Sequence, residues 1–399
     1  MVANELTNKN LLIIAPNFFT PIMDETLSIR PYFSSVYVLI PQPLFPRSLL
    51  HISSIREKYL WVSLAYPNTT KFYNANIRFL HPKSLVLPFD FMRKRALEIF
   101  SKSSLQKVSN SNLKANLIHA HRMDYGYIGT RLKEIHNIPL IITTHGSDVY
   151  NFPWRGKYEY SIARFVLRNV NHIIAITRRE AELLLSLGCP ANKISIIPNP
   201  VNVNIFRPIS QSKSRSLLNL PLNKKIILTV GTLTEVKGYT YLIDTAYVIS
   251  KTRQDIILVI VGSGPLKNFL LSKIKKLELN NKVLMVGEKP HKEIPLWLNA
   301  SDLFVLSSVD EGLPSVVLEA IACGKPVVAT QVGGIPDVVS SSDIGILVKP
   351  RDKEALAQAI LEALNRKWES EKICEYAQKY SLKNVVRQIL QVYQQVLGS

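Results

Sequence analysis

The second half of the chain alternates between short apolar runs and stretches with helical character. The apolar, β-branched runs are 226–230, 256–261, 283–286, 303–306, 327–329 and 344–348. Helix-like stretches lie between most of them, at 238–250, 265–277, 292–300, 314–323 and 353–365. Continuous apolar strands separated by helices are typical of a parallel sheet covered on both faces. We therefore expect a doubly wound α/β domain in this half.

The first half repeats this pattern less regularly. Its candidate strands are 11–15, 36–40, 117–120, 140–143 and 172–176, which indicates a second doubly wound domain. Between the halves, 194–208 begins as a short strand and continues rich in Pro and Asn, as expected of a hinge. Ligands of open parallel sheets bind at the carboxyl ends of the strands, so functional residues are expected in the loops there.

Length and composition fit this architecture. The 399 residues suit two or three domains, and 47% of them are hydrophobic, enough for separate cores. No apolar run is long enough to cross a bilayer, and the first ten residues do not resemble a signal peptide. Three widely spaced cysteines, Cys189, Cys323 and Cys374, form no disulfide or zinc pattern, so we expect a cytoplasmic location.

The formal net charge of +19 favours anionic partners such as phosphates or acidic lipids. Nucleic acid is not expected, because no zinc-finger spacing, RNP-like motif or long Lys/Arg tract is present. The segment 85–107 combines aromatic residues with a basic cluster. It suits peripheral binding to an anionic membrane, on its inner face, or else a helix packed on the domain with a basic outer side.

Two glutamates dominate the segment 310–324. Glu311 is predicted to lie in a loop, and Glu319 in an apolar helix that begins near Pro314, a residue favoured in a first turn. The N–H groups at this helix end, near Val316 and Val317, could hold a phosphate. Hydroxyls of a ribose or hexose could be the partners of the two carboxylates. The segment thus fits a nucleotide-sugar pocket, although a surface helix with a solvated glutamate fits it as well.

Other loops carry weaker signals. Lys237 follows the strand at 226–230 and could neutralise a diphosphate, although most such lysines are solvated. Gly262 and Gly264 permit close approach of a ligand, or only a tight turn. His145 ends the strand at 140–143 and could bind a substrate hydroxyl, or be structural.

No metal site is expected. His119 and His121 face the same side of a strand only as a pair, and no carboxylate or cysteine completes a ligand set. The chain also contains no Asp-x-Asp motif for holding a Mg²⁺-nucleotide. Phosphate charge must then be met by Lys, Arg and helix ends.

Together these motifs resemble the retaining glycosyltransferases of family 4, also called glycosyl transferases group 1. EGLPSVVLEAIACGKPVVAT is similar to the family's E-x7-E segment, VGTLTEVKG to its diphosphate loop, and VGSGP and VGGIPDVV to its later glycine loops. THGSD resembles its acceptor-side His loop. The resemblance implies a GT-B fold, with two Rossmann-like domains facing a central cleft. Their expected bounds are 1–201 and 202–380, with a C-terminal helix at 381–399 that rejoins the first domain.

The resemblance also implies a reaction. A hexose would move from a UDP- or GDP-linked donor to a lipid-linked or polysaccharide acceptor, with retained anomeric configuration, no metal and no other cofactor. Glu319 would bind the ribose, Lys237 the diphosphate and Glu311 the transferred sugar, while His145 would contact that sugar from the opposite domain. The residues expected to line the donor site are Gly231, Thr232, Lys237, Gly262, Gly264, Glu311, Leu313, Ser315, Val316 and Glu319.

Two departures from the family pattern keep alternatives open. Thr232 stands where the family commonly has Arg, so that one diphosphate cation is missing or comes from elsewhere, such as Arg178 or Arg179. The loop at 16–20 lacks the usual glycine pair. A nucleotide-sugar-binding protein without transferase activity is therefore an alternative. A nucleotide-sugar epimerase is another, although no clear set of acid/base carboxylates is seen in the first domain.

Overall fold

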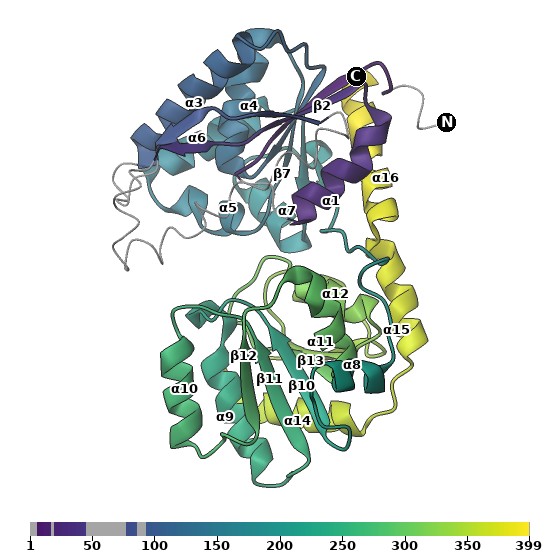
Figure 1. Ribbon diagram of the computed structural model, residues 1–399. Coiled ribbons are helices and arrows are strands. Elements are labelled where there is room, and N and C mark those ends of the chain that lie inside the picture. Colours follow the sequence, from purple (N-terminus) through teal and green to yellow (C-terminus); the bar gives the residue numbers. More distant parts are fainter. Residues whose placement is uncertain (1–5, 17–19, 45–76, 86–92, 399) are drawn as a thin grey trace. The chain divides into compact units, whose positions relative to one another are not determined.

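The computed structural model describes residues 6–16, 20–44, 77–85 and 93–398. The chain divides into two compact units. The N-terminal unit comprises Met1–Pro198 and Val385–Ser399, and the C-terminal unit comprises Asn199–Asn384. Each is an α/β sandwich around a parallel sheet (Figure 1), so the fold class predicted from the sequence is confirmed.

The N-terminal unit is built on a seven-stranded parallel sheet in the order β4-β2-β1-β6-β7-β8-β9. Its strands are β1 (Asn10–Ile14), β2 (Ser35–Leu39), β4 (Ile77–Leu80), β6 (Leu117–His121), β7 (Leu140–Thr143), β8 (His172–Ala175) and β9 (Ile194–Ile196). A separate parallel pair joins β3 (Gln42–Leu44) to β5 (Lys83–Leu85). The strand order reverses between β1 and β6, which makes this pair the switch point of the sheet.

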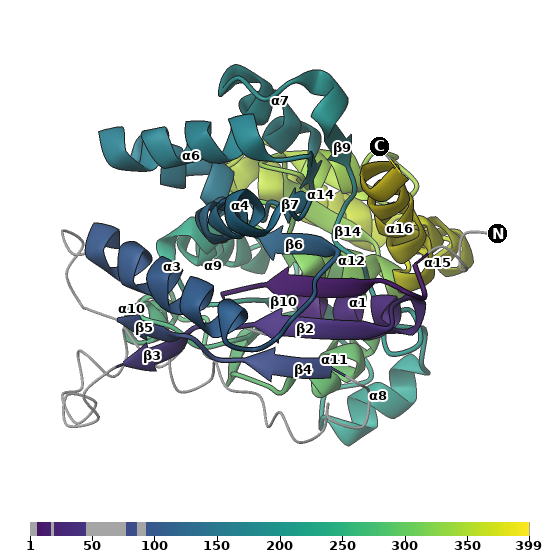
Figure 2. The same cartoon turned by 90° about the horizontal axis from the view of Figure 1, so that it is seen from above.

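Helices cover both faces of this sheet (Figures 1 and 2). They are α1 (Thr20–Ile29), α3 (Arg93–Ser109), α4 (Met123–His136), α5 (Ser147–Tyr150), α6 (Lys157–Asn169), α7 (Arg178–Ser186) and α16 (Leu382–Gly398). Along β1, Leu12 and Ile14 join one hydrophobic core, and Leu11 and Ile13 join the other. Because both faces are buried, the strand is apolar throughout. The α16 helix packs into the second core with the apolar stripe on one of its sides.

The C-terminal unit has a six-stranded parallel sheet in the order β12-β11-β10-β13-β14-β15, the order of a Rossmann fold. The strands are β10 (Lys225–Val230), β11 (Ile256–Val261), β12 (Val283–Gly287), β13 (Leu303–Leu306), β14 (Val327–Thr330) and β15 (Gly345–Val348). The main helices are α8 (Gln211–Leu217), α9 (Tyr239–Ser250), α10 (Lys267–Lys276), α11 (Ile294–Ala300), α12 (Ser315–Ala322), α13 (Ile335–Val338), α14 (Lys353–Asn365) and α15 (Ser370–Ala377). Its switch point lies between β10 and β13.

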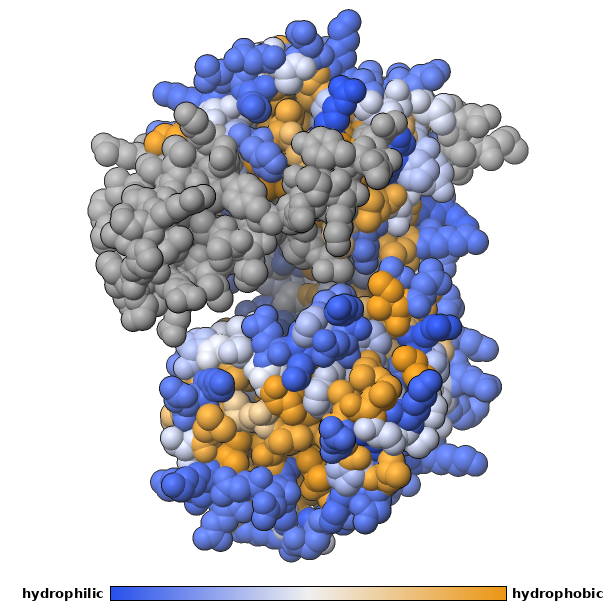
Figure 3. Space-filling model, viewed as in Figure 1, coloured by the Kyte–Doolittle hydropathy of each residue, from blue (hydrophilic) through white to orange (hydrophobic). Residues whose placement is uncertain are grey.

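Most elements predicted in this half are present within one or two residues of their expected bounds, and α14 matches its predicted range. The helix expected to begin near Pro314 begins at Ser315, with Pro314 as its N-cap. Apolar residues reach the surface over the middle of this unit, where β10–β12 lie in Figure 1 (Figure 3). Leu284 in β12, for example, is 42% exposed, as expected at a sheet edge.

Candidate functional site

Two loops flank the switch point of the C-terminal unit. One runs from β10 to α9 and contains Gly231 and Lys237; the other runs from β13 to α12 and contains Glu311. Ser307 ties them together, since its Oγ donates to the carbonyls of Lys237 and Gly238, each at 3.1 Å. Gly238 has φ +66°, and a Cβ there would lie 2.0 Å from the Ser307 carbonyl oxygen. Only glycine permits this approach of the two loops.

The two loops bring the predicted lysine and glutamate into direct contact. Lys237 Nζ donates to Glu311 Oε1 at 2.6 Å, and Ser308 Oγ donates to the same oxygen at 2.6 Å. The side chains of Lys237 and Glu311 are 23% and 10% exposed. A half-buried charge pair at a switch point can meet both the phosphates and the hydroxyls of a ligand. Ser308 was not singled out in the sequence, where nothing distinguishes it from other loop serines.

Glu319 lies on α12 and is 8% exposed, as its apolar neighbours predicted. Its partner is His291, whose Nε2 lies 2.8 Å from Glu319 Oε1. His291 belongs to a short 3-10 turn, His291–Glu293, and its ring packs 5.1 Å from that of Phe206. The His291 side chain is 44% exposed, so the pair borders solvent. This partner was not predicted, because His291 lies 28 positions before Glu319 in the sequence.

The start of α12 differs in detail from the sequence-based expectation. No side chain caps this helix, and Ser315 and Val316 are half-buried. The N–H of Val317, expected to be open to an anion, donates to the carbonyl of Pro314 at 3.0 Å. The backbone groups left for a phosphate are thus those before Val317. The neighbouring Leu313 is 7% exposed and its carbonyl accepts from Asn199 Nδ2 at 3.4 Å.

The glycines after β11 approach another loop of the protein. A Cβ on Gly262, at φ +149°, would lie 1.9 Å from the carbonyl oxygen of Gly231. A Cβ on Gly264 would lie 2.7 Å from the Leu233 nitrogen. These glycines therefore allow the close approach of their own loop to the β10–α9 loop, and their approach to a ligand stays a prediction. Thr232, the second residue of the β10–α9 loop, is exposed.

His145 lies in the N-terminal unit, directly after β7. Its N–H donates to Asp148 Oδ1 at 2.8 Å, and Asp148 Oδ2 accepts from the Met123 N–H at 2.9 Å. Burial, and secondarily the charge of Arg122, lower the pKa of His145 to about 3, so its ring is neutral at pH 7. A neutral imidazole at the end of a strand can donate or accept a hydrogen bond to a sugar hydroxyl.

The two arginines that could supply the diphosphate cation missing at Thr232 are also in the N-terminal unit. Arg178 and Arg179 open α7, and the Arg179 guanidinium lies 4.7 Å from the centroid of the Tyr150 ring. This stacking makes Arg179 a participant in the packing of its own unit.

The reason given for excluding a metal at His119 and His121 is wrong. Glu25, from α1, places Oε1 3.7 Å from His119 Nδ1 and 3.8 Å from His121 Nε2. However, His119 already uses both ring nitrogens, with Tyr393 OH at 2.6 Å and Thr143 Oγ1 at 2.7 Å. A metal would have to displace the Tyr393 hydroxyl, so these residues fit a metal poorly.

The predicted membrane segment is only partly covered by the structure. Phe89, Phe91 and Met92 lie outside the described residues. Phe100 is 3% exposed and belongs to the core of the N-terminal unit, which agrees with the alternative of a helix packed on the domain. Among the described helices, none is long and apolar enough to span a membrane.

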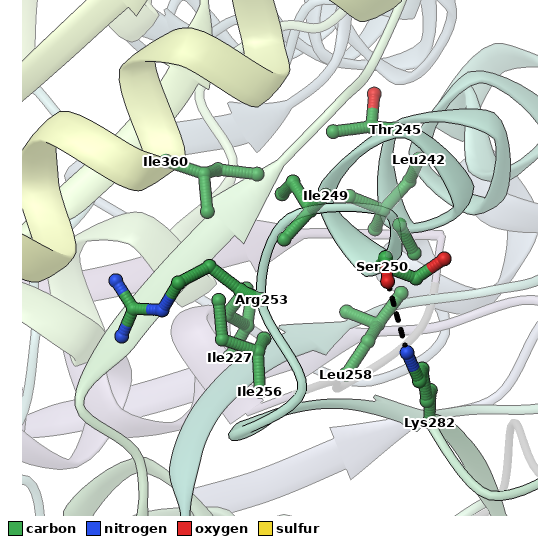
Figure 4. A pocket seen from close by; sticks show the side chains of 11 residues that line it. Ile227, Leu242, Thr245, Ile249, Ser250, Arg253, Ile256, Leu258, Lys282 and Ile360 are labelled. Carbon is green, nitrogen blue, oxygen red and sulfur yellow. Dashed lines mark hydrogen bonds between the residues drawn. The ribbon is translucent and has the colours of Figure 1, made fainter.

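Two cavities of the C-terminal unit lie away from these loops. One, of about 20 Å³, is closed by apolar side chains of α9, α14 and the early residues of β10 and β11 (Figure 4), with Lys282 Nζ donating to the Ser250 carbonyl at its edge. It could hold no more than about one water molecule. A larger one, of about 240 Å³, is lined by Lys225 and by residues preceding β13 and β14. Both border the amino ends of strands, where ligands of such sheets do not bind.

Comparison with known proteins bears on the identity of this site. Residues 210–380 match the family described as Glycosyl transferases group 1, and residues 60–205 match Glycosyltransferase Family 4. The amylovoran biosynthesis glycosyltransferase AmsK of Erwinia amylovora is 28% identical over 272 residues, which cover 65% of each chain. A D-inositol 3-phosphate glycosyltransferase of Paenarthrobacter aurescens is 32% identical over 256 residues, 61% of this chain and 62% of that protein. Both matches span less than two thirds of the relative's length.

A solved structure shares the fold over nearly the whole chain. Anabaena Alr3699/HepE, in complex with UDP, superposes with a TM-score of 0.76 at 19% identity, covering 97% of this chain and 100% of that one. The two family matches follow one another along the sequence: the first covers most of the N-terminal unit, and the second covers most of the C-terminal unit. The chain therefore belongs to the family 4 glycosyltransferases, the glycosyl transferases group 1, with the GT-B fold.

Proposed function

We propose that the protein is a retaining, metal-independent hexosyltransferase that uses a UDP- or GDP-linked sugar. The observation that carries the proposal is the Lys237–Glu311–Ser308 cluster at the switch point of the C-terminal unit. The Glu319–His291 pair in the same unit supplies a second polar position, at the helix that follows β13. Together they offer a cation for phosphates and two carboxylates for hydroxyls, as a nucleotide-diphosphate sugar requires.

In the proposed reaction the bond between the anomeric carbon and the β-phosphate oxygen breaks while the acceptor oxygen bonds to the same face of that carbon. The acceptor proton passes to the departing phosphate oxygen, so no protein nucleophile is needed. Lys237 stabilises the charge that develops on the leaving diphosphate. Glu311 orients the transferred sugar, Glu319 holds the ribose, and His145 contacts the sugar from the N-terminal unit.

The acceptor is proposed to be a growing polysaccharide or a lipid-linked glycan. AmsK is named as an amylovoran biosynthesis glycosyltransferase, which supports a role in biosynthesis. UDP is the first nucleotide to test, since HepE was solved with it. We further propose a cytoplasmic protein that associates with the inner face of the membrane, for which the net charge of +19 is the support.

The test is a transfer assay with UDP- and GDP-hexoses, run with EDTA and with Mg²⁺. We expect turnover of one donor in EDTA, a product of unchanged anomeric configuration by NMR, and loss of turnover in Glu311→Gln. The matched control is Glu354→Gln, since the Glu354 side chain is 70% exposed on α14 of the same unit. Inversion, or activity only with Mg²⁺, would contradict the proposal.

A binding protein without turnover is the second candidate, because exposed Thr232 stands near the start of the β10–α9 loop, where the family commonly has Arg. Thermal shifts combined with the transfer assay separate the two. A ligand at about 100 times its Kd stabilises the protein by roughly 2.7 kcal/mol in either case. Stabilisation by a nucleotide-sugar without hydrolysis or transfer, for every acceptor class, would favour the binding protein. The epimerase alternative predicts instead a donor whose sugar changes configuration.

A further inference from the structure

A row of three buried or half-buried polar side chains, Glu25, His121 and His145, lies at the switch point of the N-terminal unit, between β1 and β6. Glu25 is on α1, which follows β1, His121 is the last residue of β6, and His145 follows β7. Glu25 is 6% exposed and His121 is fully buried. Three elements separated in the sequence therefore bring a carboxyl and two imidazoles to the edge of the sheet where ligands bind.

Contacts link these groups in a row. His121 Nδ1 lies 3.1 Å from His145 Nε2, and the two rings stack with centroids 5.3 Å apart. His121 Nε2 and Glu25 Oε1 are 3.8 Å apart, and both are buried without a hydrogen-bond partner among the described residues. Buried polar atoms without partners are rare in native proteins and call for a partner. A side-chain movement of about 1 Å would bring these two within hydrogen-bond distance of each other.

We propose that Glu25 is a positioning residue, which acts through His121 to fix the ring nitrogen on which His145 carries its proton. The assignment follows from hydrogen-bond roles in a row of neutral imidazoles. If Glu25 donates to His121 Nε2, then His121 carries its proton on Nδ1 and donates it to His145 Nε2. The proton of His145 is then on Nδ1. If Glu25 is ionised, it accepts from His121 Nε2, and His121 Nδ1 then accepts from His145 Nε2. His145 Nδ1 carries no proton in that case.

The structure favours the first arrangement. Burial raises the pKa of Glu25 to about 8, so its carboxyl is protonated at pH 7 and can donate. Burial holds the pKa of His121 well below its ordinary value, so this ring carries a single proton. His145 would thus present an N–H at Nδ1, suited to donate to a sugar oxygen. This last step rests on the proposed function, whereas the tautomer itself does not.

The variants Glu25→Gln and Glu25→Leu separate this role from packing. The glutamine amide can still donate to His121 Nε2, whereas leucine cannot. Thr26→Val is the matched control, because Thr26 is the next residue of α1, is 1% exposed and has a hydroxyl without a hydrogen-bond partner in the part of the chain that the structure describes. Two-bond ¹H–¹⁵N spectra of ¹⁵N-His-labelled protein report which nitrogen of each ring is protonated, and His145→Asn assigns the signals.

We expect His145 protonated on Nδ1 in wild type, Glu25→Gln and Thr26→Val, and a mixed or reversed tautomer in Glu25→Leu. Transfer should fall roughly tenfold in kcat in Glu25→Leu, the effect of one misoriented hydrogen bond, and recover in Glu25→Gln. An unchanged His145 tautomer in folded Glu25→Leu would overturn the proposal. So would one equivalent of Zn²⁺ bound by wild type and lost in both Glu25 variants, which would make these residues metal ligands. If wild type transfers no sugar, the spectra still decide the tautomer.

Discussion

Replacing Lys237 by methionine tests the donor site most directly. The change keeps the length of the side chain and removes the ammonium that lies 2.6 Å from Glu311 Oε1. A charge-assisted hydrogen bond to a phosphate is worth about 1.5–3 kcal/mol. If donor binding draws Lys237 away from Glu311, about 1 kcal/mol of that partly exposed pair is lost in return. The net effect is about 0.5–2 kcal/mol, or a roughly 2- to 30-fold weaker Kd for the nucleotide-sugar.

Isothermal titration of the nucleotide diphosphate and of the nucleotide monophosphate measures this effect. The diphosphate should lose affinity in Lys237→Met, and the monophosphate should lose less, because the ammonium is assigned to the diphosphate. Lys273→Met is the matched control. Its ammonium also pairs with a carboxylate, at 2.7 Å from Asp244, and its side chain is 20% exposed, close to the 23% of Lys237.

A double-mutant cycle of Lys237→Met and Glu311→Gln then measures the interaction free energy between the two side chains. Non-additive effects on Kd are expected, since the two side chains are in contact and share one ligand. A Lys237→Met variant that binds the diphosphate within twofold of wild type would exclude Lys237 as a diphosphate ligand. An equal loss of affinity in Lys273→Met would exclude it too, because the loss would then come from the lower net charge of the unit and not from a contact of Lys237.

Three further changes have defined outcomes. Gly262→Ala forces a Cβ to within 1.9 Å of the Gly231 carbonyl at φ +149°, so we expect a loss of about 1–3 kcal/mol in unfolding free energy and weaker donor binding, by thermal unfolding and titration. Glu319→Gln should reduce the preference for UDP over 2′-deoxy-UDP about tenfold, while the Kd of the deoxynucleotide stays unchanged. If GDP is the ligand, the same change is expected for GDP over 2′-deoxy-GDP. Burial raises the pKa of Glu180 from 4.5 to about 8, so the folded state holds a proton that the unfolded chain releases between these values. Stability should therefore fall as pH rises from about 4.5 to 8, by up to about 1.4 kcal/mol per pH unit, and Glu180→Gln should reduce that slope in thermal unfolding curves; an equal slope in both proteins would contradict the assignment.

The sequence predicts the central strands well because burial on both faces makes them continuously apolar. In β10 and β13 nearly every residue is buried, and both were found within one residue of their bounds. The edge strand β4 does not show this signal: only its first and last residues are buried, and its run was not distinguished from a loop. The edge strand β9 has no buried residue, and only the start of the segment 194–208 was predicted as a short strand. What sets a strand apart in the sequence is therefore its place in the sheet as much as its propensity.

The residues of the candidate donor site were found because they fall in loops after strands, at spacings that a family motif preserves. Their partners were missed because each comes from an element distant in the sequence. The carboxyl that His119 and His121 lacked is supplied by Glu25, 94 residues before His119. A signal for it exists in α1, where Ile22, Glu25 and Ile29 fall on one helical stripe and are all buried. A glutamate on the apolar stripe of a helix after the first strand of a doubly wound sheet indicates polar groups near the switch point, since a buried carboxyl needs hydrogen-bond partners even when it is protonated. Such a residue can therefore be sought in the sequence before any motif is recognised.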